Sequence, residues 1–308
     1  MLTRSLLRTK IAQVLYANIQ NNKGFQAFDN ELKLSVKKSY DLYHLLLLLP
    51  QEIAFAAQKE VDSYSTRLLK TNRSIAPIAN MATQKFPQLL AKNEALCRYT
   101  HENSISWAAY DDELGNMYQR LKSALFFDKY IKEEALDFET EKTFWRKFYR
   151  SNEVFDPTFE DFLEELSIYW NDDMTITLSF IDKTITKLTE ENILTTPLLP
   201  MYKDGNEQDF VFKLAHSAYL KGDEYGEIIS KTVPKWDIGR ITRMDMVLLR
   251  MAIAEFKEFP LIPVDVTINE YIEIAKFYST DKSHIFINGI LDKISKDMLE
   301  EDSMMKVK

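Results

Sequence analysis

Two arginines near the start of the chain have a type and spacing that suggest binding chemistry. Arg4 and Arg8 stand four residues apart in a segment of helical pattern, so we expect their side chains to share one face. The segment holds no acidic residue to neutralise them, and Lys10 adds positive charge nearby. Arginine donates to phosphate through a planar fork and stacks on flat rings. The residues alone leave open whether this face binds a ligand or only meets solvent.

The signatures of common catalytic and metal sites do not occur in the sequence. It has no glycine-rich phosphate loop, no dinucleotide-binding glycine motif and no nucleophile elbow. Asp41 and His44 have the spacing of two metal ligands on a helix, but the repeated Glu-x-x-His motif of a bundle metal centre is missing. The single cysteine, Cys97, rules out an intramolecular disulfide framework. We expect a protein that is not an enzyme and holds no cofactor or metal ion.

The composition predicts an all-α protein of the cytoplasm. The 308 residues are 45% hydrophobic and 28% charged, and they include only 7 glycines and 9 prolines to interrupt helices. No stretch approaches the roughly 18 apolar residues that a membrane span needs, and the polar N-terminus does not read as a signal peptide. Because the net charge is −8, any nucleic-acid binding must use a local basic patch.

Helical periodicity organises the first two thirds of the chain. Residues 3–20 predict an amphipathic helix that is capped by Thr3 and ends before Gly24. Residues 25–206 contain many further helical patterns with dense aromatic side chains, which we interpret as buried core. This middle region carries nearly all of the net negative charge and is therefore a poor candidate for a nucleic-acid surface.

The last third contains three blocks in a recognisable order. Residues 207–299 predict several helices, one of which we expect Asp237 to cap, and residues 300–308 predict a frayed tail. The blocks are Ile241–Phe256, Ile262–Phe277 and Ser283–Ile294. They contain in turn Leu-Arg-Met-Ala-Ile-Ala-Glu, then Ile-Pro with Ile-Asn-Glu and Ala-Lys, and finally Phe-Ile-Asn-Gly-Ile-Leu-Asp-Lys.

These blocks, together with Gln13-x-Leu15-Tyr16 in the first helix, resemble the NusB family of bacterial transcription antitermination factors. The resemblance covers roughly residues 1–20 and 207–297. It implies a NusB-like helical bundle that is discontinuous in sequence, with its first helix in residues 1–24 and its remainder in residues 207–299. Residues 25–206 are then an inserted helical region of unknown role. Asn269 and Glu270 are interpreted as structural residues that tie neighbouring helices together.

The resemblance also implies binding of boxA-like single-stranded RNA. Arg4, Arg8 and Lys10 align with the basic run through which family members contact RNA, although Ser5 and Leu6 stand where further basic residues are common. A second RNA element is expected at the start of the last helix and the end of the preceding one, where a helix N-terminus offers a seat for phosphate. Its residues are Lys276, Phe277, Lys282, Ser283 and Phe286.

A protein partner follows from the same resemblance. Family members pair with NusE, a small-subunit ribosomal protein, and act on the transcription elongation complex during ribosomal RNA synthesis. Tyr16 and Asp245 match the positions that face this partner.

Two other functions stay open at this point. The negative net charge, and the small number of basic residues in the first helix, favour a helical scaffold that binds proteins and has lost RNA binding. NusB-like domains also occur fused to RNA methyltransferases, but scarce glycine and the lone Cys97 argue against that enzyme. The inserted region could cover the RNA-binding face, extend it or bind another factor.

Overall fold

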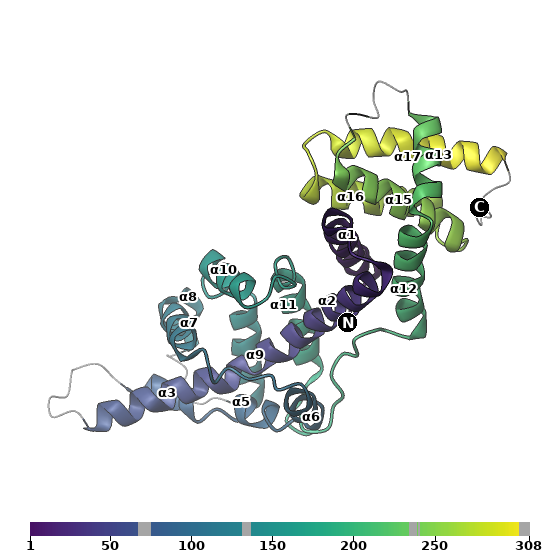
Figure 1. The fold of residues 1–308 in the computed structure, drawn as a ribbon. Coiled ribbons are helices and arrows are strands. Elements are labelled where there is room, and N and C mark those ends of the chain that lie inside the picture. The colour runs from purple at the N-terminus through teal and green to yellow at the C-terminus, as the bar shows by residue number, and fades with distance from the viewer. Residues whose placement is uncertain (67–74, 131–136, 234–238, 240, 302–308) are drawn as a thin grey trace. The chain divides into compact units, whose positions relative to one another are not determined.

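The computed structural model describes residues 1–66, 75–130, 137–233, 239 and 241–301, and these form helices and connecting turns without a strand (Figure 1). The all-α prediction is confirmed. It follows from a chain rich in helix formers and poor in the glycine and proline that end helices. No helix in this part of the chain is both long and apolar enough to cross a membrane.

The chain divides into two compact units. The first unit comprises Met1–Val36 and Met201–Lys308, and the second comprises Lys37–Pro200. We expected the inserted region to begin at residue 25, whereas the structure groups the following residues, up to Val36, with the first unit.

The reason for this boundary lies in α2 (Phe25–Leu47), which belongs to both units. Near its start, the Phe28 ring stacks on Tyr219, with centroids 4.9 Å apart. Asp29 Oδ1 lies 2.8 Å from His216 Nε2, so a polar contact supports the same packing. These contacts bind the first turns of α2 to the helix that follows residue 204.

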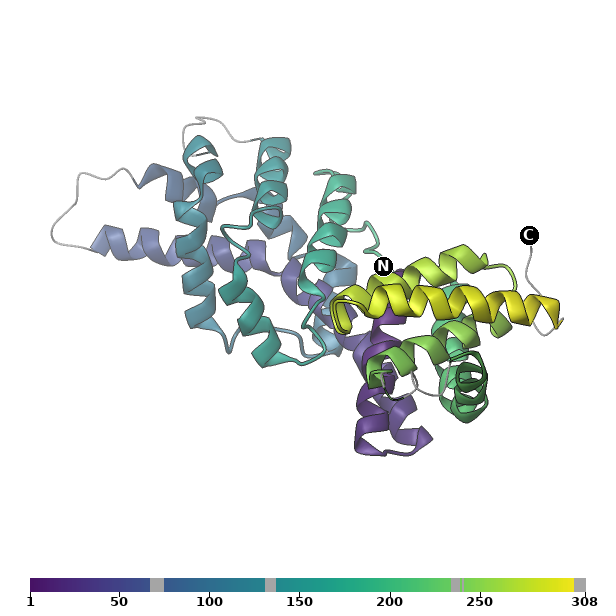
Figure 2. The same ribbon diagram turned by 90° about the horizontal axis from the view of Figure 1, so that it is seen from above.

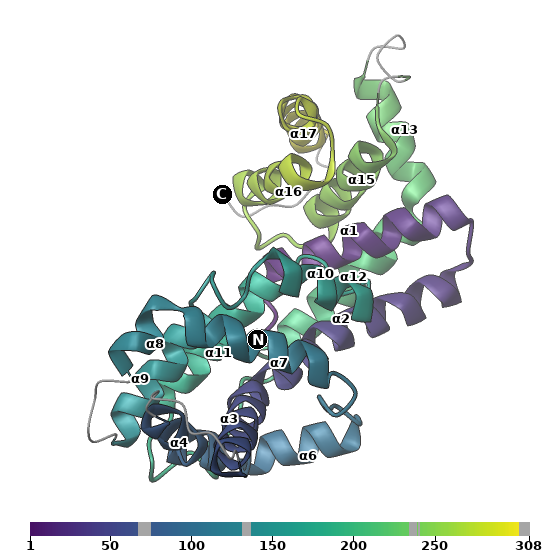
Figure 3. The ribbon, with the colours of Figure 1, turned by 90° about the vertical axis from the view of Figure 1, so that its left-hand side faces the viewer.

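The first unit is a bundle around one central helix, α15. Most of α15 is shielded from solvent. Every residue from Val247 to Leu249 and from Met251 to Phe256 is buried. Helices α1, α12, α13, α16 and α17 all pack against it (Figures 1 and 3). The bounds are α1 (Arg4–Asn21), α12 (Gly205–Leu220), α13 (Gly222–Thr232), α15 (Arg243–Glu258), α16 (Val264–Tyr278) and α17 (Ser283–Glu300).

Helix α1 forms as its sequence pattern predicts. Thr3 Oγ1 accepts from the Leu6 amide at 3.3 Å, which confirms the predicted cap. The helix ends at Asn22, whose φ of 48° places it in the left-handed region. The predicted stripe of Leu7, Ile11, Val14 and Leu15 is buried. Burial of each such side chain contributes roughly 1.5–3 kcal/mol.

Helix α15 begins differently from the prediction. Thr242 caps it by accepting from the Asp245 amide at 3.0 Å. Asp237, the expected cap, lies outside the described residues.

The second unit is a helical bundle with an aromatic core. Trp107, Trp145, Phe148 and Phe159 are fully buried, so the interpretation of the middle-region aromatics as core is confirmed for these residues. The remaining helices are α3 (Leu49–Thr66), α4 (Ala76–Ala82), α5 (Lys85–Leu90), α6 (Glu94–Glu102), α7 (Asp111–Ser123), α8 (Leu125–Tyr130), α9 (Phe138–Tyr149), α10 (Pro157–Leu166) and α11 (Met174–Lys187).

Candidate functional site

Arg8 lies inside the first unit rather than on its surface. Only 2% of the residue is exposed. Its Nε and Nη2 donate to the two carboxylate oxygens of Glu255 at 2.8 and 2.7 Å, and Nη1 lies 3.3 Å from Glu270 Oε2. The expectation of an exposed Arg8 that contacts RNA is therefore wrong. Its guanidinium joins α1 to α15 and α16, so Glu270 has the predicted tying role.

The electrostatics of this cluster favour a charged Arg8. Burial alone would lower the pKa of Arg8, but the hydrogen bonds and negative charge of Glu255 outweigh burial and raise that pKa above its ordinary value. Glu255 is itself inaccessible to solvent and also accepts from Thr267 Oγ1 at 2.8 Å and from the Tyr271 hydroxyl at 3.2 Å. Burial and the charge of Glu255 raise the pKa of Tyr271, which stays a neutral donor.

Glu255 is a structural residue that sequence reasoning missed. A signal was present, because it is the one acid between Val247 and Phe256, a segment otherwise nearly all apolar. An acid on a buried helix face requires a cationic or hydrogen-bonding partner. Arg8 is that partner, although 247 positions separate the two residues.

The other two cations of α1 differ from each other. Lys10 is 2% exposed, so the expectation of an accessible RNA contact is wrong for this residue as well. Arg4 is partly exposed, with its Nε 3.9 Å from Glu207 Oε1 and its guanidinium 4.9 Å from the centre of the Phe210 ring. Of the three predicted cations on α1, Arg4 alone keeps substantial access to solvent.

Asp245 is buried and anchors a loop, so the expectation that it faces a protein partner is wrong. Its carboxylate accepts from Ser279 Oγ at 2.6 Å and from Ser283 Oγ at 3.0 Å. Ser283 is 3% exposed and also shares a hydrogen bond with Ser279. Because the Ser283 hydroxyl is buried and hydrogen-bonded within the loop, the prediction that it contacts RNA is wrong. Together these three residues fix the connection between α16 and α17.

The connection between α16 and α17 brings the remaining predicted RNA residues to one exposed edge. We define the α16–α17 edge as Lys276, Phe277, Lys282 and Phe286. Lys276 and Phe277 lie in the last turn of α16. Lys282 caps the start of α17, which is yellow in Figure 2, and Phe286 lies in its first turn. Phe277 is 82% exposed, Lys282 is exposed and Phe286 is partly exposed.

The electrostatics of this edge favour an anion. Lys282 makes no ion pair within the described part of the chain, whereas Lys276 pairs with Glu273. The first turn of α17 has no acid, and Asp281 stands in the loop just before the helix. An exposed ring beside a cation and a helix N-terminus can stack on a base and receive a phosphate.

Helix α1 lies beside this edge. Gln13 Nε2 donates to the Tyr278 hydroxyl at 3.2 Å, next to Phe277 in sequence. Tyr16 is partly exposed on α1, and its hydroxyl makes no hydrogen bond within the described residues. Arg243, which sequence reasoning did not single out, is exposed at the start of α15 and donates to Gln20. The described residues contain no cluster of His, Cys, Asp and Glu that could hold a metal ion.

Comparisons with known proteins agree with this fold and these motifs. The NusB family model matches residues 177–296. The transcription antitermination protein NusB of Salinibacter ruber is 38% identical over 108 residues, which are 35% of this chain and 68% of that protein. NusB of Natranaerobius thermophilus is 35% identical over 122 residues, or 39% of this chain and 86% of that protein. No solved structure matches.

The matched share of these relatives is large enough to assign a family. More than two thirds of each aligns with this chain. The segment matched by the family model contains α15, α16 and most of α17, with the residues that fix the α16–α17 edge. The chain belongs to the NusB family of transcription antitermination proteins.

Proposed function

We propose that the protein binds boxA-like single-stranded RNA together with NusE and supports ribosomal RNA transcription, without enzymatic activity of its own. Family membership supports the proposal at the level of transcription antitermination. The observation that carries it further is the α16–α17 edge, where Phe277 is 82% exposed and Lys282 makes no ion pair within the described residues. Exposure of a large aromatic ring costs hydration free energy that a stacked base would recover.

The residues proposed to contact RNA and NusE differ from those that the sequence predicts, because several of the predicted residues are buried. Lys276, Phe277, Lys282 and Phe286 form the RNA surface, Arg4 adds a partly exposed cation and Tyr16 contacts the protein partner. Arg8, Lys10, Asp245 and Ser283 are buried, and the contacts of Arg8, Asp245 and Ser283 hold the helices in place.

The experiment compares two exposed apolar residues at opposite ends of α16. Phe277→Ala removes the proposed stacking ring, and Leu261→Ala removes a side chain of a residue that is 81% exposed just before the helix. Binding of a labelled boxA-like RNA, followed by fluorescence anisotropy in the presence of NusE, should weaken by about 1–3 kcal/mol for Phe277→Ala. It should stay unchanged for Leu261→Ala. Equal RNA affinity of both variants and the unmodified protein would contradict the RNA surface.

A scaffold without RNA binding is the second candidate. The observation in its favour is that Arg8 and Lys10 are buried, which leaves fewer accessible cations on α1 than the sequence predicts. The same titration separates the two functions. A protein that binds NusE but not boxA-like RNA, even with NusE present, is a scaffold.

A further inference from the structure

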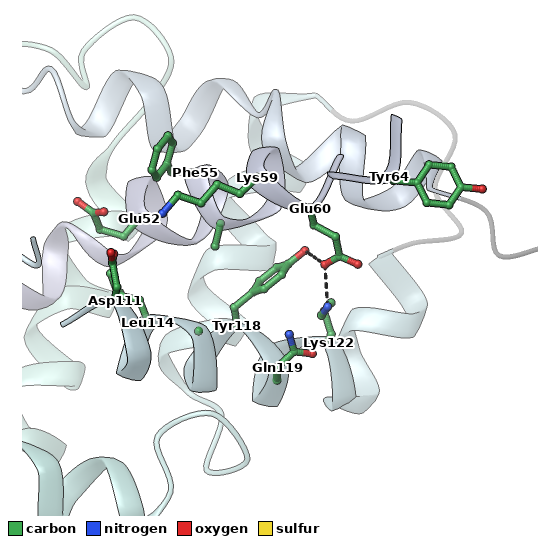
Figure 4. A pocket seen from close by; sticks show the side chains of 12 residues that line it. Glu52, Phe55, Lys59, Glu60, Tyr64, Asp111, Leu114, Tyr118, Gln119 and Lys122 are labelled. Carbon is green, nitrogen blue, oxygen red and sulfur yellow. Dashed lines mark hydrogen bonds and ion pairs between the residues drawn. The ribbon is translucent and has the colours of Figure 1, made fainter. Parts of the chain in front are cut away.

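A groove lies between α3 and α7 in the second unit (Figure 4). It encloses about 480 Å³ and is lined along one face of each helix. On α3 the lining residues recur at positions 52, 55, 56, 59 and 60, and on α7 at 111, 114, 115, 118 and 119, so both sets follow the helical repeat. The groove lies outside the unit that contains the α16–α17 edge.

The middle of the groove holds the Phe55 ring, with the Lys59 ammonium over it, and an open space at Gly115. Phe55 is 54% exposed there, although it stands on a long helix with a well-buried opposite face. Across from it, Gly115 lies inside α7, and a Cβ at this position would meet no atom within 4 Å. A glycine inside a helix costs about 1 kcal/mol relative to alanine. Packing within the described residues does not account for that cost, and the missing side chain keeps the groove open.

The two ends of the groove differ in charge. At one end Glu60 accepts from the Tyr118 hydroxyl at 2.8 Å and from Lys122 Nζ at 2.7 Å, so its charge is compensated. At the other end the carboxylates of Glu52 and Asp111 make no ion pair or hydrogen bond within the described residues.

The carboxylates at this end repel each other. Burial raises the pKa of Glu52, and the nearby charge of Asp111 raises it further. Lys59 opposes this shift only in part, and its ammonium lies over the Phe55 ring, 4.6 Å from the ring centre. A cation placed between the two carboxylates would relieve the repulsion.

We propose that this groove binds a basic amphipathic helix of a partner protein, with an arginine or lysine between Glu52 and Asp111 and an apolar side chain between Phe55 and Gly115. Charge complementarity selects this occupant, because Glu52 and Asp111, which Lys59 offsets only in part, repel a nucleic acid and attract a cation. Asp111 and Gly115 are one helical turn apart, so the basic and apolar residues of the bound helix are three or four positions apart.

The probes are two synthetic helical peptides of about four turns. Both carry leucine and alanine on the same face, and one has arginine four positions before each leucine where the other has glutamate. Anisotropy titrations use the full-length protein. We expect the arginine peptide to bind at least about tenfold more tightly than the glutamate peptide, with an affinity that falls as salt rises. Equal affinities, or no binding of the arginine peptide, would overturn the proposal.

Variants locate the binding within the protein. Glu52→Gln with Asp111→Asn should weaken binding of the arginine peptide about tenfold. The matched control, Glu94→Gln with Glu102→Gln, removes two exposed acids of α6 outside the groove and should leave the affinity unchanged. An equal loss in both double variants indicates non-specific charge attraction and contradicts the groove.

A filling variant tests the apolar part separately. Gly115→Leu occupies the open space, while leucine favours the helix more than glycine does, so α7 should stay folded. Circular dichroism confirms the helix content. Loss of peptide binding with retained helicity supports the groove, and unchanged binding contradicts it.

Discussion

At the scale of single residues, burial decides whether a charge can reach a ligand. Arg8 and Lys282 are both cations of the first unit. Arg8 is enclosed by Glu255 and Glu270, whereas Lys282 is exposed and makes no ion pair within the described residues. The first is therefore suited to stabilising the fold, and the second is free to meet the RNA that we propose as the ligand.

Loss of Arg8 should destabilise the first unit. Arg8→Ala leaves Glu255 as an uncompensated buried charge, so we expect the free energy of unfolding to fall by about 3–5 kcal/mol. Arg4→Ala, on the same helix but with a partly exposed side chain, should change it by less than about 1 kcal/mol. Urea unfolding followed by circular dichroism measures both. Similar stability of the two variants would contradict the buried ion pair.

A paired substitution separates the lost charge from lost packing. Replacing Arg8 and Glu255 together by methionine removes both charges and keeps most of the volume, so this double variant should be more stable than Arg8→Met alone. A double variant less stable than Arg8→Met would show that Glu255 is not penalised by the loss of its partner.

His44 makes the stability of the second unit depend on pH. Burial between Tyr40 and Tyr99 lowers the pKa of His44 to about 4, from an ordinary value of about 6.5. The unfolded chain therefore takes up a proton at a higher pH than the folded protein. Stability should be full above pH ~6.5 and fall by up to ~1.4 kcal/mol per unit as the pH drops toward 4.

His44→Phe tests this linkage. The substitution keeps a ring against Tyr99 but removes the titrating group. The difference in unfolding free energy between pH 7 and pH 5, followed by the fluorescence of the buried Trp107 and Trp145, should shrink in the variant. An unchanged difference would assign the acid sensitivity to other groups.

At the scale of elements, local patterns were predictable and long-range pairs were not. Leu7, Ile11 and Val14 follow the helical repeat, so the buried face of α1 could be derived from the sequence. Arg8 lies on the same helix, but its environment depends on Glu255, far away in the chain. Helical periodicity carries no information about such a distant partner, so the sequence alone predicts an exposed Arg8.

In the candidate site, too, local features could be predicted from the sequence and long-range contacts could not. The sequence resemblance suggested Lys276, Phe277 and Lys282 as RNA contacts, and in the structure a short loop brings the two helix ends that carry them together. The role of Asp245 could not be predicted, because its hydrogen bonds to Ser279 and Ser283 depend on how α15 crosses that loop.

Helix α17 contains a glycine that helix geometry does not require. Gly289 is exposed, has no positive φ, and a Cβ there would meet no atom within 4 Å. Close packing of another helix therefore does not explain this glycine within the described residues. Gly289→Ala should therefore stabilise the protein by about 0.5–1 kcal/mol. Thermal unfolding by circular dichroism checks this, and a lower midpoint would contradict it.

At the scale of the whole molecule, the boundary within α2 predicts how the chain can be shortened. Deletion of residues 37–200, with a flexible Gly/Ser linker, keeps the contacts of Phe28 with Tyr219 and of Asp29 with His216. Deletion of residues 25–206 removes them and exposes Tyr219. We expect the shorter deletion to unfold cooperatively and the longer one to be less stable.

Denaturant unfolding of the two deletion proteins tests this boundary. A steeper transition at higher urea concentration for the 37–200 deletion supports the division into two units. Equal or higher stability of the 25–206 deletion would show that the start of α2 contributes nothing to the first unit.

The central claim is that the first unit binds RNA and NusE jointly, and one measurement tests it most directly. The accessible cations of α1 and the α16–α17 edge are few, so the acidic protein alone should hold boxA-like RNA weakly. A bound basic ribosomal protein adds positive charge. Coupling between two sites is typically 1–3 kcal/mol, so saturating NusE should raise RNA affinity roughly 5- to 150-fold, and RNA should raise NusE affinity by the same factor. Titration of labelled boxA-like RNA at zero and saturating NusE gives this ratio. A ratio of one, with both binary complexes observed, would contradict joint binding.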